Sequence, residues 1–269
     1  MAAGSKDRRE RAAAARAAAQ AGEKRRERIV RIVGAAVVGL VVVGIIGVAV
    51  FARNSDQAGT ELVSADVDAN APRPTGVFGP DDEFAFGVPY GTASQDAPVV
   101  EVWEDMQCPA CGVLEAAAGA SLGDAAERGD IRLIWRPVTF LDRGTDASTR
   151  AVSAWGCAID AGKVREYHDR IYADQPLEGE GWTDEQLLAY GADVGLTGDD
   201  YAAFEQCVND RTYASWAANG TAQAATTGVT ATPTILVNGS ETFEGQDART
   251  LLQNDPEAFL AAITGGSGS

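Results

Sequence analysis

The longest apolar stretch of the chain lies near its N-terminus. Residues 32–52 (IVGAAVVGLVVVGIIGVAVFA) contain no charged or strongly polar side chain. At ~1.5 Å per residue a helix of this length spans about 31 Å, which matches the hydrocarbon core of a bilayer. A core helix of a soluble domain carries polar residues on one face, and this segment carries none. The pattern therefore predicts one transmembrane helix over 32–52.

Beyond this segment, short β-branched runs alternate with longer helical patterns. The run at 99–104 (VVEVWE) predicts a strand, the Ala-rich stretch at 109–127 predicts a helix, and 131–139 predicts a second strand. This βαβ order is what two parallel neighbouring strands need. Further helical patterns follow at about 146–172, 183–192, 198–208 and 211–227.

The C-terminal part begins with a short apolar strand at 234–237 (TILV). Asn238-Gly239 follows it, and this dipeptide is typical of a hairpin turn, so a partner strand is expected around 241–243. A last helix is predicted over about 247–262. The fold class is therefore a layered α/β (α+β) domain, with a βαβ half, a ββα half and helices inserted between them at about 146–227.

Charge divides the chain at the apolar segment. The net charge is −17; eleven of the 22 Lys and Arg residues but only four of the 39 Asp and Glu residues lie at or before Arg53, so the chain beyond it carries −24. The positive-inside rule then places residues 1–31 in the cytoplasm and the C-terminal domain outside. A domain this acidic repels phosphates, which excludes nucleic acid as a partner. An uncleaved anchor is favoured over a removed signal peptide, because the apolar run is longer than a typical signal-peptide core.

Composition sets the other boundaries. After the basic cytoplasmic segment 1–31 and the anchor, residues 53–83 are rich in Asn, Ser, Asp, Gly and Pro and are predicted to form a flexible linker. Residues 84–264 have the composition of one globular domain large enough for a hydrophobic core. The tail 265–269 (GGSGS) is predicted to be disordered.

The candidate chemistry lies in Cys108-Pro109-Ala110-Cys111, where the first of the predicted parallel strands gives way to a helix. At a helix N-terminus, unpaired N–H groups and the helix dipole stabilise a thiolate, so the pKa of Cys108 is expected below its ordinary value of about 8.5. Pro109 fits the first helical turn, where no N–H is needed. Cys111, one turn further on, is expected to be less exposed and to attack a mixed disulfide from within. A stabilised thiolate makes the disulfide a stronger oxidant.

Two other interpretations of this motif are weaker. A structural disulfide across two residues closes almost no loop and adds little stability. A zinc site needs four ligands, usually in two close pairs, whereas Cys157 and Cys207 stand about 50 residues apart and His168 is the single histidine. Redox chemistry is therefore favoured, and no metal or organic cofactor is predicted.

Two runs of sequence resemble the DsbA-type branch of the thioredoxin superfamily: 99–111 (VVEVWEDMQCPAC) and 228–239 (GVTATPTILVNG), with the helical block between them. The resemblance covers about residues 84–264 and implies a thioredoxin fold with a helical insertion. It implies that Cys108 is the nucleophilic cysteine and Cys111 the resolving one. It also implies that Pro233 is a cis-proline opposite them, which brings the backbone of Thr232 beside Cys108. An extended substrate chain can then add there like a strand.

The sequence departs from this family at two places. The best-known members carry a buried acid six residues before the first cysteine, which assists proton transfer at the second thiol, and here that position is Val102. Glu104, which shares the face of Val102 in a regular strand, and Asp105 are the candidate replacements, with simple solvated acids as the alternative. The Pro-Ala dipeptide lacks the histidine of the family's strongest oxidants, so the strength of oxidation stays open.

The predicted helical insertion contains two further cysteines and the histidine. Cys157 and Cys207 have apolar neighbours at helical spacing, so in an oxidising compartment we expect them to form a structural disulfide. Two separate thiols and a second redox relay are the alternatives. His168 is interpreted as a solvated or packed imidazole, ahead of a catalytic residue or a metal ligand.

Together these features predict a membrane-anchored, extracytoplasmic protein disulfide oxidoreductase that introduces disulfides into secreted or membrane proteins. The expected partners are cysteine-containing protein substrates, the lipid bilayer through residues 32–52, and a membrane redox partner that reoxidises the Cys108–Cys111 pair. A reductase or isomerase of the same fold and a non-catalytic module that binds unfolded chains (a holdase) are the alternatives.

Overall fold

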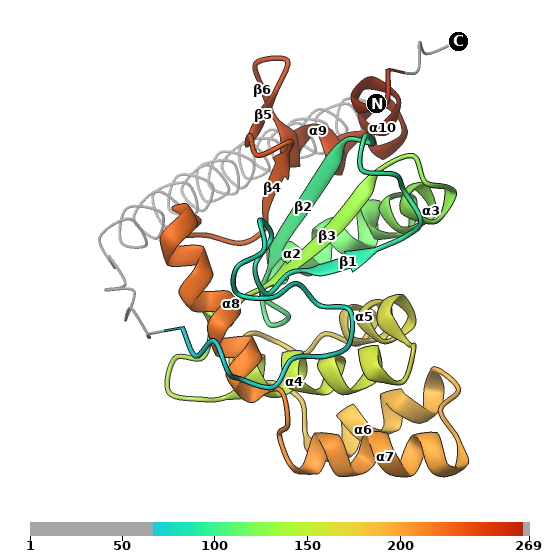
Figure 1. The fold of residues 1–269 in the computed structure, drawn as a ribbon, viewed down its shortest axis with the longest axis vertical. Helices are drawn as coiled ribbons and strands as arrows, with labels where there is room; N and C mark the ends of the chain where they lie inside the picture. The colour runs from blue at the N-terminus through green and yellow to red at the C-terminus, as the bar shows by residue number, and fades with distance from the viewer. Residues whose placement is uncertain (1–66, 266–269) are drawn as a thin grey trace, which may run out of the picture. The chain divides into compact units, whose positions relative to one another are not determined.

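The computed structural model describes residues 67–265 (Figure 1). The predictions for the basic segment 1–31, the anchor 32–52 and nearly all of the tail 265–269 fall outside these residues. Among the helices that are described, none combines the length and the apolar character that a membrane crossing needs.

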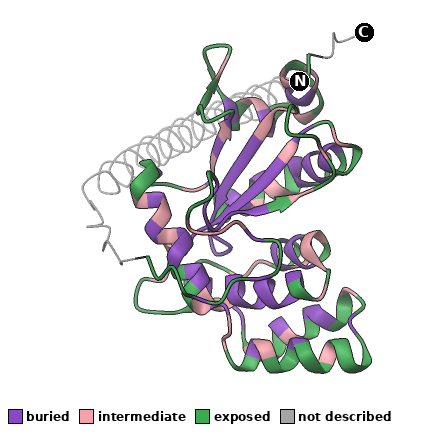
Figure 2. Cartoon of the chain, viewed as in Figure 1, coloured by how far each residue is buried: buried purple, intermediate pink, exposed green. Residues whose placement is uncertain are grey.

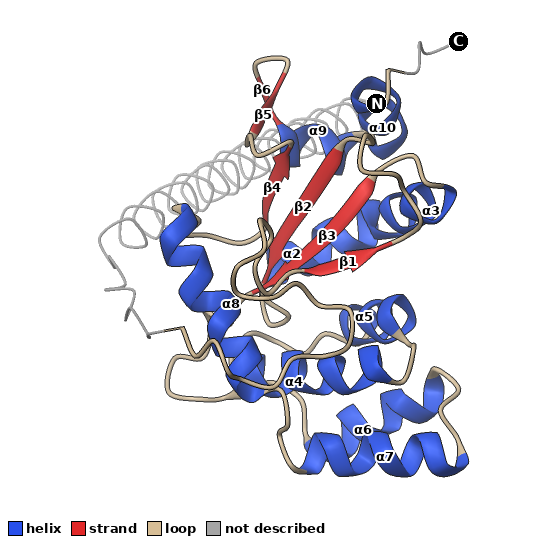
Figure 3. Ribbon diagram, viewed as in Figure 1, coloured by secondary structure: helices blue, strands red, loops and turns tan. Residues whose placement is uncertain are grey.

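A four-stranded sheet forms the centre of the domain (Figure 3). Its strand order is β1-β3-β2-β4, with β1 (Val88–Tyr90), β2 (Val99–Glu104), β3 (Arg132–Pro137) and β4 (Thr234–Val237). β2 and β3 run parallel, as the βαβ pattern predicts, while β1 and β4 are antiparallel to their neighbours. β1 was not predicted, because three residues are too few to show an alternating pattern.

One helical run joins β2 to β3. It consists of α2 (Pro109–Leu114), a π-helical turn η1 (Glu115–Gly119) and α3 (Ala120–Arg128), where the sequence predicts a single helix. Gly129 ends the run in the left-handed conformation, at φ +80°, which a residue without a Cβ adopts at no steric cost.

Five helices form the insertion, and Figure 1 shows α4 to α7 grouped at one end of the sheet. They are α4 (Ala147–Asp160), α5 (Val164–Ala173), α6 (Asp184–Asp193), α7 (Gly198–Asn209) and α8 (Ala214–Thr227). The predicted helix at 146–172 is two helices, because the chain reverses at Gly162, which has φ +71°. A disulfide joins Cys157 of α4 to Cys207 of α7.

The C-terminal end follows the prediction only in part. Asn238 and Gly239 make the tight turn, with φ +50° and +81°. After the turn, the chain pairs with β4 only through the single bridge between Val237 and Ser240. The predicted partner strand, β5 (Thr242–Phe243), pairs instead with β6 (Gln246–Asp247). The predicted last helix is two, α9 (Ala248–Asn254) and α10 (Pro256–Ile263), because Pro256 has no N–H with which to continue α9.

The prediction of a flexible linker over 53–83 is wrong for residues 67–83. Ala71 and Val77 are buried against the domain. The backbone N–H of Asp68 donates to Asn219 Oδ1 at 2.9 Å, and Asn219 Nδ2 donates back to the Asp68 carbonyl at 2.8 Å. A composition rich in Pro, Gly and Asp disfavours regular structure, but it does not keep an irregular segment from packing where side chains of the domain satisfy its backbone.

The alternation of β2 sorts its side chains onto two faces of the sheet. Val100 and Val102 pack into the main core. Figure 2 shows β2 and β3 coloured largely as buried. On the opposite face Glu101 pairs with Arg136, whose guanidinium carbon lies 4.0 Å from the centre of the Trp103 ring. Glu104, the last residue of the strand, shares the face of Val100 and Val102. This places its carboxylate on the side of the sheet where α2 begins.

Candidate active site

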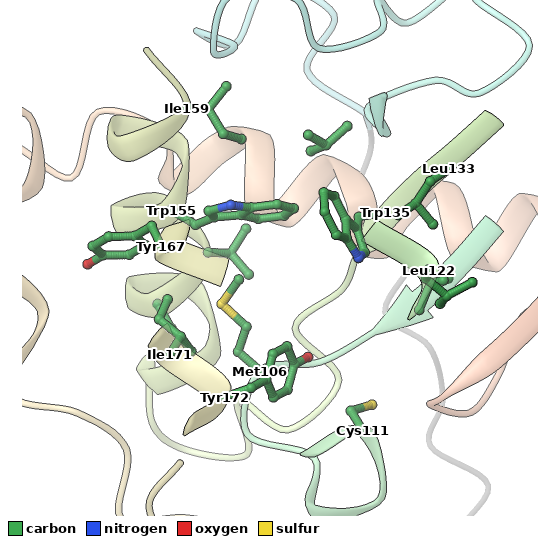
Figure 4. Packing of buried hydrophobic residues seen from close by; sticks show 14 of the residues in the cluster. Met106, Cys111, Leu122, Leu133, Trp135, Trp155, Ile159, Tyr167, Ile171 and Tyr172 are labelled. Carbon is green, nitrogen blue, oxygen red and sulfur yellow. The ribbon is translucent and has the colours of Figure 1, made fainter. Parts of the chain in front are cut away.

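The cysteine pair lies at the start of α2, just after the short loop that follows β2. Cys108 is the N-cap residue of α2 and keeps 8% of its surface exposed, whereas Cys111 has no exposed surface. Figure 4 shows Cys111 at the edge of the aromatic core, near Met106 and Tyr172. Pro109 and Ala110 between the cysteines are exposed. Both thiols are free, so the structure represents the reduced pair.

The pKa of the Cys108 thiol is lowered to about 6. The largest cause is a hydrogen bond from the Cys111 thiol, which stabilises the thiolate against the opposing effect of burial. The Thr232 side chain and the backbone N–H groups of Cys111 and Ala110 stabilise it further. The direction is the predicted one. The helix N-terminus contributes, but the neighbouring thiol contributes more.

The pKa of Cys111 moves in the opposite direction. Burial raises it far above its ordinary value, and the charges of Cys108 and Glu104 add to the effect. At neutral pH the pair therefore consists of a Cys108 thiolate and a Cys111 thiol. Such a pair has one sulfur ready to react with a substrate and one that holds its proton inside the protein.

We expect the alkylation rate of Cys108 to rise with pH and to reach half of its maximum near pH 6, because only the thiolate is nucleophilic. The rate constant for iodoacetamide, measured by mass spectrometry on the reduced chain, gives this profile directly. Cys111→Ala removes the largest stabilising hydrogen bond and should move the midpoint toward the ordinary value. A wild-type midpoint near about 8.5 would show that Cys108 is an ordinary thiol.

Thr232 and Pro233 lie opposite the cysteines. The peptide bond between them is cis, and the Thr232 carbonyl oxygen is 3.4 Å from Cys108 Sγ. β4 begins at the next residue and pairs with β2, which holds this segment beside the start of α2. The structure thus brings together the four residues that the family resemblance named, although they come from two ends of the domain.

The two candidate acids, Glu104 and Asp105, are both buried but have different neighbours. Asp105 Oδ1 accepts from the Gln107 N–H at 2.9 Å and from Ser148 Oγ at 2.6 Å, and Oδ2 accepts from the Leu141 N–H at 2.9 Å. Burial raises its pKa to about 6. Through these hydrogen bonds Asp105 fixes the loop before Cys108, whereas Glu104 is the acid whose charge raises the pKa of Cys111.

Glu104 pairs with His168 of α5. Its Oε1 lies 2.5 Å from His168 Nε2, and neither side chain is accessible to solvent. Burial lowers the pKa of His168, but Glu104, Asp169 and Glu115 outweigh it and raise the pKa to about 10, so the imidazole is charged at neutral pH. The interpretation of His168 as a packed imidazole is confirmed, and a solvated one is wrong.

A third side chain, Glu115, completes this cluster. Glu104, Glu115 and His168 each offer an oxygen or nitrogen, and these atoms lie within 4.8 Å of one another. In the part of the chain that is described, these side chains could hold a metal ion. The hydrogen bond between Nε2 and Oε1 joins an imidazole nitrogen to a carboxylate oxygen directly, however, which is the arrangement of an ion pair.

Gln175, which follows α5, is a further residue that the sequence did not point to. Its Nε2 donates to the carbonyl oxygens of Met106 at 2.8 Å and Cys108 at 3.0 Å. A Cβ on Gly112 would come within 2.3 Å of Gln175 Oε1, so the glycine one residue after Cys111 makes room for this contact. Gln175 thus ties the insertion to the loop that carries Cys108. A lone Gln in a polar stretch gives no sequence signal for such a role.

The family model described as Thioredoxin matches residues 90–254 of the chain. The chain belongs to this thioredoxin family. The match covers β2, β3 and β4 of the sheet, the cysteine pair, the Thr232–Pro233 segment and the inserted helices. The predicted mixed α/β thioredoxin-like fold with a helical insertion is confirmed.

Among solved structures, the chain is similar to oxidised DsbA from Mycobacterium tuberculosis, with 25% identity and a TM-score of 0.52 over 66% of this chain and 93% of that one. It is also similar to MdbA, a thiol-disulfide oxidoreductase from Actinomyces oris, with 21% identity and a TM-score of 0.56 over 67% and 88%. BdbD from Bacillus subtilis, oxidised, gives 19% identity and a TM-score of 0.52 over 71% and 98%. With the family match, the likeness to DsbA confirms the predicted enzyme class, a DsbA-like protein disulfide oxidoreductase.

Two curated proteins match part of the chain. The Na(+)/H(+) antiporter NhaA 1 of Salinispora arenicola is 34% identical over 146 residues, which are 54% of this chain and 21% of that protein. NhaA 3 of Salinispora tropica is 31% identical over the same length. The chain thus spans about a fifth of the length of these relatives, and ion transport is said only of them.

Proposed function

We propose that the protein is an extracytoplasmic oxidant that introduces disulfides into secreted or membrane proteins through Cys108 and Cys111. In this proposal residues 32–52 anchor it in the membrane with the N-terminus in the cytoplasm. Cysteine-containing chains are its substrates, and a membrane redox partner reoxidises it. Tethering the domain beside that partner raises the effective concentration of each for the other.

The observation that carries the proposal is the opposite character of the two thiols. The pKa of Cys108 is lowered to about 6, while burial holds Cys111 in its protonated form. A stabilised Cys108 thiolate favours the reduced pair, and a pair that favours its reduced form is a good oxidant of other thiols. The site therefore favours donating a disulfide to a substrate rather than reducing a disulfide of the substrate, even though the Pro109-Ala110 dipeptide carries no histidine.

The reaction begins when a substrate thiolate attacks Cys108 Sγ of the Cys108–Cys111 disulfide. The bond between the two protein sulfurs breaks, and its electron pair stays on Cys111, which takes up a proton. A second substrate thiolate then attacks the substrate sulfur of the mixed disulfide and releases Cys108 as a thiolate. The substrate has lost two electrons and the cysteine pair has gained them. During the mixed-disulfide stage, the Thr232 backbone beside Cys108 offers a place where an extended chain can align.

The reduction potential of the Cys108–Cys111 pair tests the direction of this reaction. We expect a value much closer to about −120 mV, typical of disulfide donors, than to the −270 mV or so of a reductant. The full chain is equilibrated with glutathione buffers of known potential, and alkylation then reports the fraction of each state. The Cys157→Ser/Cys207→Ser variant, measured alongside, shows that the titrating pair is Cys108–Cys111. A value near −270 mV would favour the reductase or isomerase, and a pair that never titrates would favour the holdase.

A further inference from the structure

Four buried polar atoms around the Glu104–His168 pair have no hydrogen-bond partner among the described residues. They are Glu104 Oε2, Glu115 Oε1, His168 Nδ1 and the Tyr172 hydroxyl. The Tyr172 ring lies 5.0 Å from the imidazole, centre to centre. Buried polar groups are almost always paired, so a group without a protein partner calls for another one, such as a water molecule or an ion. This cluster therefore has unused polar capacity with which to bind a ligand.

Two carboxylates and an imidazole are also a set of metal ligands. Glu104 ends β2, Glu115 begins η1 and His168 lies in α5, and one ligand atom from each lies within 4.8 Å of the other two. An imidazole nitrogen suits Zn²⁺, whereas Ca²⁺ and Mg²⁺ prefer oxygen ligands alone. With a neutral imidazole, the two carboxylates balance the charge of one divalent ion. The set therefore favours Zn²⁺ over the common hard cations.

The surroundings of His168 orient the ring as a metal ligand is oriented. When one ring nitrogen binds a metal, the other usually faces a carboxylate or a carbonyl group. Here Nε2 points to Glu104, and Nδ1 lies 3.6 Å from Asp169 Oδ1. The rings of Trp135 and Trp155 pack against the imidazole, with centroids 4.6 and 5.1 Å away. These neighbours keep Nε2 directed at the two glutamates.

A pocket connects the cluster to the surface. It has a volume of about 310 Å³, lies between η1 and α5, and is bordered by Glu115, Asp169 and Tyr172. A Cβ on Gly119 would come within 2.3 Å of Glu115 Oε2, so the glycine leaves the space in which this carboxylate lies. The two acids at the pocket attract a cation, and the pocket has room for a water molecule beside it. An ion can therefore reach the cluster without passing Cys108.

Zinc binding has to replace the ion pair with metal bonds. Tetrahedral ligand atoms about 2.1 Å from Zn²⁺ lie roughly 3.4 Å from one another. His168 Nε2 and Glu104 Oε1 lie 2.5 Å apart, so they have to separate by about 1 Å while the Glu115 carboxylate moves inward. The proton between Nε2 and Oε1 leaves to water as the ion enters, because a metal ligand needs a free lone pair.

We propose that Glu104, Glu115 and His168 bind one Zn²⁺ ion, with a water molecule from the pocket as the fourth ligand. Three protein ligands and one water are the arrangement of an open zinc site. The site uses neither thiol of the Cys108–Cys111 pair. It is therefore a binding site in addition to the proposed redox function, and it can be tested without disulfide exchange.

Zinc binding by the oxidised, untagged full chain tests this site. Oxidation joins Cys108 to Cys111, and Cys157 is already bonded to Cys207, so no thiol is left to bind the ion. After treatment with a chelator and its removal, Zn²⁺ is titrated by calorimetry. We expect one tight equivalent per chain, and no comparable binding of Ca²⁺ or Mg²⁺. Because His168 is the single histidine of the chain, the X-ray absorption spectrum of the bound zinc should show one imidazole and no sulfur.

Three variants separate this site from general attraction to an acidic surface. Glu115→Gln removes one ligand but keeps the Glu104–His168 pair, and it should raise the Kd for Zn²⁺ at least about ten-fold. Gly119→Ala crowds the same carboxylate without changing a charge and should weaken binding in the same direction. Asp124→Asn, the control, removes an exposed carboxylate of α3 that lies outside the cluster and should leave the Kd unchanged.

Four results would overturn the inference. The first is a wild-type chain that binds no zinc, and the second is bound zinc whose spectrum lacks an imidazole. The third is the same Kd in Glu115→Gln as in the wild type. The fourth is an equal loss of affinity in Asp124→Asn, which would mean that zinc binds through the negative charge of the surface. The reduction potential of the cysteine pair is measured separately, so these results leave the proposed redox function as it stands.

Discussion

Replacing Cys108 by serine is expected to reduce thiol–disulfide exchange at least about 10³-fold, to the rate of the uncatalysed reaction. The reason is chemical: Cys108 is the sulfur with the lowered pKa and the one whose surface is partly open, and serine can form no disulfide. The measurement is oxidation of a reduced peptide with two cysteines by the full chain, followed by alkylation and mass spectrometry.

Cys111→Ser is the matched control, because it removes the other sulfur of the same motif by the same change of atom. When the disulfide-bonded form of the same peptide is supplied, this variant still lets Cys108 attack the disulfide but leaves no thiol to resolve the product, so a mixed disulfide should accumulate. The two variants should therefore fail in different ways. If Cys108→Ser retained the wild-type rate, the redox site would have to lie elsewhere. If it lost exchange but still bound unfolded chains, it would retain a holdase activity.

The sequence predicted those parts of the site that depend on local pattern. The strand at 99–104 and the helix after it place Cys108 at a helix N-terminus, and this local geometry is enough to foresee a low pKa. The alternation of β2 also put Glu104 on the face of Val102. The pairing of Thr232 and Pro233 with Cys108 spans more than 120 residues of chain. Only the resemblance to a family supplied that contact, because no local pattern encodes it.

The parts that were missed depend on contacts between distant elements. In the sequence, His168 and Glu115 lie in helical stretches among charged residues. No local pattern around either residue predicts that α5 packs against η1 and β2. The π turn was not predicted either. A regular helix over 109–127 implies one set of residues on each face, and the wider π turn at Glu115–Gly119 changes which residues share a face. The absence of the family's buried acid at Val102 led to Glu104 as a candidate in β2. The residues that surround Glu104 could not be predicted in the same way, because the cluster is built from three elements.

His168→Leu is expected to cause the largest loss of stability of any single change in this site, about 3–5 kcal/mol. The imidazole and the Glu104 carboxylate are both buried, so removing the positive charge leaves a negative one without its partner. Urea unfolding of the full chain at pH 8, followed by circular dichroism, measures the free energy of unfolding.

The double variant Glu104→Leu/His168→Leu separates the lone charge from the lost packing. If the cost arises from the unpaired carboxylate, removing both groups should recover much of the stability, whereas a packing defect would only deepen.

The same ion pair should affect how the stability of the wild type depends on pH. Folding raises the pKa of His168 from its ordinary 6.5 to about 10, so the native chain binds the extra proton in this window. The stability from this group is complete below pH 6.5 or so and is lost as pH rises toward 10. A flat profile in that window, with additive single and double variants, would mean that the contact between Glu104 and His168 carries no net charge interaction.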